Sequence, residues 1–185
     1  MITREEALEL LNQKISNPNT RKHSIASEAV LRALAERLGE DPNIWGLCGL
    51  LHDIDLEEVE NDMHRHAKIG AGWLEERGFS AEATHAVLSH NAEGTGVERE
   101  SKLDFALTCG EQITGLIVAT ALVYPSKKLA DVKVKSITKR MGEKRFAAGV
   151  SRERVMDCEK LGLSLEEFVE ISLKAMQGVA DEMGL

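Results

Sequence analysis

Apolar residues recur at intervals of three and four along almost the whole chain, with polar residues between them. Leu8, Leu11 and Ile15 set this spacing near the N-terminus, and it returns in every later segment. No sustained stretch alternates apolar and polar residues, as a half-buried strand does. The pattern therefore predicts an all-α protein, a compact bundle of many helices without a substantial sheet.

Capping and stop signals divide this pattern into separate helices. Thr3 and Glu6 form a capping box for the first helix, and the segment Asn17-Pro18-Asn19 is expected to stop it. Further helices are predicted over about 20–38, 41–54, 64–77, 80–90 and 99–123. Asn91 to Gly96 is expected to be a polar loop.

Shorter elements are expected after the helix that stops before Pro125. The basic stretch that follows predicts a loop and one or two short helices, and Ser151 caps another. Ser164 and Glu167 form a second capping box for a last helix that ends near Met183. We predict one domain over 1–185, with its motif region at about 20–123 and the helices of about 131–183 packed on it. A stripe of Met176, Val179 and Met183 favours completion of the bundle over pairing with another subunit, and a dimer stays an alternative.

The charge of the chain indicates which kinds of molecule it is expected to bind. The formal net charge of −8 argues against a protein that coats a nucleic-acid polymer, because such binding depends on positive charge. One stretch reverses this balance, with eight basic residues and two acidic ones between Lys127 and Arg145. It is interpreted either as a solvated surface or as a patch that attracts a phosphorylated substrate.

The cysteines and the apolar stretches of the sequence suggest the cellular compartment of the protein. The three cysteines form no C-x-x-C pair and indicate reduced thiols, so we expect a cytoplasmic protein. The N-terminus has acidic residues where a signal peptide needs a basic start. The most apolar long window, 103–123, contains Asp104, Glu111 and Gln112, which favours a buried helix and no membrane partner.

The doublet His52-Asp53 ends the apolar run from Trp45 to Leu51. An ionised carboxylate is costly to bury without a partner, and a His beside an Asp is a common pair of metal ligands. Four more candidate ligands share the inward faces of other predicted helices: His23, His66, His90 and Glu111. One shared cation would offset the desolvation of all these groups. Mixed imidazole and carboxylate donors suit Mn, Fe, Zn, Co or Ni, as one ion or two, better than Ca.

The order of these residues resembles the HD domain superfamily of metal-dependent phosphohydrolases. His52-Asp53-Ile54-Asp55 resembles the HDIG form of its motif, His66 to Ala71 resembles the following H-x-x-x-G-A element, and the segment around Glu111 resembles the one that carries the closing family Asp. Two positions depart from the pattern, because the closing acid is a Glu and Asn91 stands where many relatives have a second His.

The resemblance implies hydrolysis of a phosphomonoester or phosphodiester in a small phosphorylated molecule, with a nucleotide as the expected substrate. It implies that His23, His52, Asp53 and Glu111 hold one metal. His66 and His90 then either hold a second metal, bridged by Asp53, or donate hydrogen bonds to phosphate if only one metal binds. Asp53 is also a predicted catalytic residue, Glu93 and Asp55 are candidate general bases, and Lys22 and Asn91 are candidate substrate contacts. The alternatives are a regulatory module that binds metal and nucleotide with weak turnover, and a di-iron oxygenase on the same scaffold.

Overall fold

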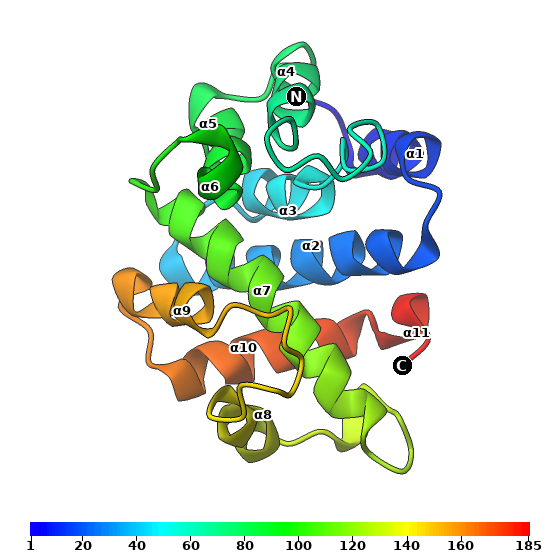
Figure 1. Ribbon diagram of the computed structural model, residues 1–185, viewed down its shortest axis with the longest axis vertical. Coiled ribbons are helices and arrows are strands. Elements are labelled where there is room, and N and C mark those ends of the chain that lie inside the picture. Colours follow the sequence, from blue (N-terminus) through cyan, green and yellow to red (C-terminus); the bar gives the residue numbers. More distant parts are fainter.

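The computed structural model describes all residues, 1–185, and confirms the all-helical prediction (Figure 1). The first part of the chain forms α1 (Arg4–Lys14), α2 (Pro18–Leu38), α3 (Pro42–Leu51), α4 (Lys68–Glu75), α5 (Ala81–His90), α6 (Ala92–Thr95) and α7 (Lys102–Leu122). The second part forms the 3-10 helix η1 (Leu129–Asp131), α8 (Val134–Met141), α9 (Arg152–Val155), the 3-10 helix η2 (Met156–Leu161), α10 (Leu165–Gly178) and α11 (Ala180–Met183).

The N-terminal capping box is present, and α1 ends at Lys14, shortly before the segment that was predicted to stop it. Thr3 accepts a hydrogen bond from the Glu6 backbone N–H, and the Glu6 carboxylate accepts one from the Thr3 N–H. Asn17 caps the start of α2, where its side chain accepts from the Asn19 N–H and Pro18 occupies the first turn. Proline fits there because the first N–H groups of a helix have no intrahelical partner.

The two helices around the doublet are shorter than predicted. α3 ends at Leu51 rather than at 54, and α4 begins at Lys68 rather than at 64, so His52 and His66 both lie in turns. The start of α4 is capped by a residue that lies twelve positions or more before it in the sequence. Asp55 accepts hydrogen bonds from the backbone N–H groups of Ala67 (3.2 Å) and Gly70 (2.7 Å), which fixes the start of α4.

Three smaller expectations are also corrected. A short helix, α6, forms where a polar loop was predicted, and the last predicted helix is divided at Val179 into α10 and α11. Ser164 accepts from the Glu167 N–H as expected, but no reciprocal bond closes a capping box. The Glu167 carboxylate binds Arg37 of α2 instead, at 2.8 Å.

The helices pack around α2 and α7. Figure 1 shows α7 crossing in front of α2 and α10, with α4, α5 and α6 at one end and α8 and α11 at the other. The crossing of α2 and α3 is close, because a Cβ on Gly49 would lie 2.7 Å from the Ser27 backbone oxygen. This contact sets the separation between the helix that carries His23 and the helix that precedes His52.

One cluster of 42 buried residues forms the hydrophobic core and includes Phe168, Met176 and Met183 from the C-terminal helices. This continuity supports the prediction that those helices complete the bundle. The helix α7 is long and apolar enough to cross a membrane by length and composition, yet 67% of its most apolar window is buried inside the protein. It is packed as a core helix of the bundle.

Candidate metal centre

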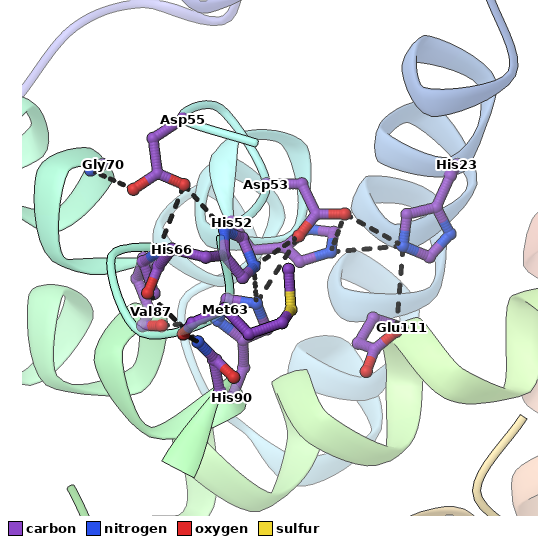
Figure 2. A network of polar contacts seen from close by, with 12 residues as sticks. His23, His52, Asp53, Asp55, Met63, His66, Gly70, Val87, His90 and Glu111 are labelled. Carbon is purple, nitrogen blue, oxygen red and sulfur yellow. Dashed lines mark hydrogen bonds and ion pairs between the residues drawn. The ribbon is translucent and has the colours of Figure 1, made fainter. Parts of the chain in front are cut away.

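Five separate segments bring the predicted ligands to one place, shown in Figure 2. His23 comes from α2, His90 is the last residue of α5, and Glu111 lies in the middle of α7. His52 and Asp53 follow α3, and His66 lies in the turn before α4. The structure therefore brings together all six predicted ligands.

Each of the four imidazoles is held through its Nδ1 atom. Nδ1 of His52 lies 2.9 Å from the Gly49 carbonyl oxygen, and Nδ1 of His90 contacts the Val87 carbonyl oxygen. Carbonyl oxygens accept hydrogen bonds and never donate them, so both rings carry their proton on Nδ1. The Nε2 atoms of these two rings are then free to present a lone pair.

The other two imidazoles are oriented by side chains. The Thr114 hydroxyl donates to the Glu111 carbonyl oxygen at 2.7 Å, so its oxygen is left to accept from Nδ1 of His23 at 3.0 Å. Nδ1 of His66 donates to the Asp55 carboxylate at 2.7 Å. A hydrogen bond of this kind on the outer nitrogen is the usual way in which a metal-binding histidine is oriented.

The free Nε2 atoms face one another in two pairs. The Nε2 atoms of His23 and His52 are 3.2 Å apart, and those of His66 and His90 are 3.1 Å apart. Two lone pairs at this separation repel unless a cation or a proton lies between them. The donor set therefore fits a bound metal, and the imidazole and carboxylate chemistry suits a divalent transition metal.

Asp53 lies between the two histidine pairs, with one oxygen toward each. Its Oδ2 atom lies 3.8 Å from His23 Nε2 and 3.4 Å from His52 Nε2. Its Oδ1 atom lies 3.2 Å from His66 Nε2 and 3.5 Å from His90 Nε2. This arrangement divides the centre into two halves that share one carboxylate.

Glu111 completes the half that contains His23 and His52. Its Oε2 atom lies 3.7 Å from His23 Nε2, and the ligand atoms of these three residues all lie within 4.8 Å of one another. Its other oxygen, Oε1, accepts from the Gln112 side chain at 2.6 Å. The longer Glu side chain thus still reaches the centre.

The electrostatics of the centre favour positive charge. Burial disfavours the charged form of Asp53, but the neighbouring histidines outweigh it and hold its pKa well below the usual range. Burial also opposes charge on His66, yet its hydrogen bonds with Asp53 and Asp55 raise its pKa to about 9. Burial raises the pKa of Glu111 to about 7. A cation in the centre would take the place of the proton that Asp53 and Asp55 attract to His66.

The remaining predicted site residues have other surroundings. Asp55 is fully buried and directs its oxygens to His66 and to two backbone N–H groups. Asn91 donates to the backbone oxygens of Met63 (2.7 Å) and His66 (3.1 Å). Lys22 is exposed and lines a cavity that also includes His23. The carboxylate of Glu93 is bound by Arg154, and this contact lowers its pKa.

Four further residues near the centre were not predicted as site residues from the sequence. Thr114 orients His23, and Gln112 contacts Glu111. Arg154 and Arg99 both approach Glu93. Thr114 and Gln112 stand within three residues of Glu111, so helical spacing was a signal for them, whereas only the folded chain brings Arg154 to Glu93.

Replacement of Thr114 by valine is expected to weaken metal binding by about 10-fold to 100-fold, the usual cost of losing a partner of a metal-binding histidine. Valine keeps the shape but removes the oxygen that accepts from His23. Titration calorimetry with Mn²⁺ measures the effect. Thr120→Val is the matched control, because that buried hydroxyl lies on the same helix and contacts only the Leu116 carbonyl oxygen. Equal affinities in the two variants would contradict the role of Thr114.

Comparison with known proteins places this geometry in a family. The HD domain family model matches residues 20–120, more than half of the chain, and the chain belongs to that family. Ribonuclease Y from Opitutus terrae is 31% identical over 77 residues, which are 42% of this chain and 15% of the relative. The chain thus spans only a small part of that relative's length. No solved structure matches.

Proposed function

We propose that the protein is a metal-dependent phosphohydrolase that acts on a small phosphorylated molecule, with a nucleotide as the expected substrate. The observation that carries the proposal is Asp53, whose two oxygens face the Nε2 atoms of two histidine pairs. Membership of the HD domain family, whose members are generally metal-dependent hydrolases, supports the same reaction class. The name of the relative, Ribonuclease Y, also points to phosphodiester chemistry.

The residues of the centre form two groups, each of which could hold one divalent ion. His23, His52, Asp53 and Glu111 would hold one divalent ion, and His66, His90 and Asp53 would hold a second one. Bound there, such an ion lowers the pKa of water and polarises a phosphoryl oxygen. Asp53 is partly accessible, with 15% of its side chain exposed, so it is placed to orient a water molecule in the centre.

A cavity beside His23 suits the organic part of a substrate. It has a volume of about 530 Å³, and six of its twelve lining residues are hydrophobic. Lys22 lies at its edge and is proposed to contact a phosphate there. A lining that is half hydrophobic and carries a lysine is an arrangement expected for a small phosphorylated compound.

Asp55 and Asn91 are proposed to position ligands, not to contact substrate. Both oxygens of Asp55 are used inside the chain, which leaves it no access to a water molecule near the substrate. The amide of Asn91 holds the turn that carries His66.

The experiment is a panel of nucleotides and the generic substrate bis(p-nitrophenyl) phosphate, each incubated with the protein and Mn²⁺, Fe²⁺, Co²⁺, Ni²⁺ or Zn²⁺. We expect hydrolysis of at least one compound, with loss of activity when EDTA is added. Saturable nucleotide binding without product would instead favour the regulatory module. Two bound irons per chain with consumption of O₂ would favour the oxygenase, for which the six ligands are a sufficient number.

Replacement of Asp55 by asparagine is expected to weaken binding of one of two metals by about 10-fold to 100-fold. The asparagine amide cannot accept from both His66 and Gly70 as the carboxylate does, so the His66 ring loses its fixed orientation. Metal titration followed by elemental analysis measures the effect. Asp104→Asn is the matched control, because Asp104 is also fully buried and also binds backbone N–H groups, at the start of α7. Two tightly bound ions in Asp55→Asn would count against a positioning role.

A further inference from the structure

Two arginines converge on one exposed carboxylate beside the metal centre. Arg154 of α9 binds the Glu93 carboxylate, and the guanidinium of Arg99 lies 3.9 Å from the same oxygen. The arginine side chains are only 25% and 17% exposed, whereas that of Glu93 is 64% exposed. The side chains of Arg99 and Arg154 are therefore largely buried, whereas the Glu93 carboxylate between them is exposed to solvent.

This arginine pair is anchored to the residues of the centre. Arg99 donates to the backbone oxygen of His90 at 3.5 Å and to the Thr108 hydroxyl at 2.8 Å. These contacts fix the Arg99 guanidinium beside the end of α5, where His90 enters the centre. Its place does not depend on Glu93.

Arg154 is anchored through α9. Gln112 donates to the Glu111 carboxylate and accepts from the Ser151 backbone N–H at 2.7 Å. Ser151 in turn caps α9, accepting from the Arg154 N–H at 3.3 Å. A chain of hydrogen bonds thus leads from a metal ligand to the helix that carries Arg154.

We infer that Arg99 and Arg154 form a binding site for a phosphate group, and that the Glu93 carboxylate occupies this site when no phosphate is bound. Paired guanidinium groups match the oxygens of phosphate, which carries more charge than a carboxylate and accepts more hydrogen bonds. Exposed ion pairs contribute little stability, so phosphate can displace Glu93 at low cost. The inference rests on the proposed function only in assigning the bound phosphate to a substrate.

Glu93 then has a different role from the one that the sequence suggested. A carboxylate held by two arginines is a poor proton acceptor, because the pairing stabilises its ionised form. Glu93 then competes with the substrate phosphate instead of acting as the general base that the sequence suggested. It would set how tightly the site binds anions.

The test measures binding of inorganic phosphate to metal-free protein by titration calorimetry at low ionic strength, so that neither metal nor turnover is needed. Glu93→Gln removes the internal competitor and is expected to tighten phosphate binding by about twofold to fivefold, in line with the small stability of an exposed ion pair. Arg154→Gln in that background is expected to weaken it by about tenfold or more, the effect of losing a charged hydrogen-bond donor. Glu143→Gln and Arg37→Gln are controls, because each removes one member of a separate surface ion pair.

Two additions keep the test decisive. Arg154→Lys retains the charge without the planar pair of donors and is expected to bind phosphate with intermediate affinity, while thermal unfolding shows that each variant is folded. A second titration measures the affinity for AMP, a phosphate ester, and compares it with the affinity for inorganic phosphate. Binding of AMP and binding of inorganic phosphate are both expected to weaken when Arg154 is replaced. Folded Arg154→Gln that binds phosphate as well as its parent, or Glu93→Gln without tighter binding, would overturn the inference. Arg154-dependent binding without any hydrolysis would sustain it and count only against the proposed reaction.

Discussion

Replacement of Asp53 by alanine is expected to abolish high-affinity metal binding and to lower hydrolysis by at least about 10²-fold to 10³-fold, a typical cost of losing one electrostatic stabiliser of the transition state. Asp53 supplies the only carboxylate that lies within 4 Å of Nε2 in all four histidines. Without it, each histidine pair would have to bind a divalent cation with less negative charge nearby.

Thermal unfolding with and without Mn²⁺ gives a readout that does not depend on the substrate. A metal that binds only the folded state raises the midpoint of unfolding, so the wild-type protein should be stabilised by Mn²⁺ and Asp53→Ala should not be. Asp131→Ala, which changes an exposed carboxylate of η1, should respond as the wild type does. An unchanged metal response in Asp53→Ala would show that the ions bind elsewhere.

Replacement of Gly49 by alanine is expected to destabilise the protein by about 1–3 kcal/mol, the usual cost of overpacking. The added methyl group would lie 2.7 Å from the Ser27 oxygen and 2.8 Å from its carbonyl carbon. These are backbone atoms of α2, which cannot rotate away as a flexible side chain can. The two helices must therefore separate, which also moves His23 away from His52.

Chemical denaturation measures this effect, and metal titration measures its consequence at the centre. Gly72→Ala is the matched control, because Gly72 lies in α4 and a Cβ there would meet nothing within 4 Å. Alanine favours helix over glycine, so this control should be stabilised by about 0.5–1 kcal/mol. If the two variants had the same stability, the close approach of α2 and α3 would not be the constraint described above.

The helices were largely predictable because their signals are local. Thr3 and Glu6 form the capping box that their spacing predicted, and the periodic apolar positions gave the helices that carry His23, His90 and Glu111. The predicted helix boundaries are wrong where a residue distant in the sequence determines where a helix begins. Nothing near the predicted start at 64 shows that Asp55 caps α4 at Ala67 and Gly70.

The candidate ligands could be predicted from the sequence, but the residues that orient them could not. A buried histidine or carboxylate on an apolar face is unusual in any sequence, so His23 and Glu111 stood out. The partners of these groups are ordinary residues, such as Thr114, which become informative only when the Nδ1 contacts are known. His66 was expected on a helix face and lies in a turn, yet Asp55 still directs it to the centre.

The most direct test of the central claim is anomalous diffraction from a crystal of the protein loaded with Mn²⁺. We expect two peaks, one between His23 and His52 and one between His66 and His90, with Asp53 between the two. Peaks away from these histidines, or none in a crystal with millimolar Mn²⁺, would contradict the claim.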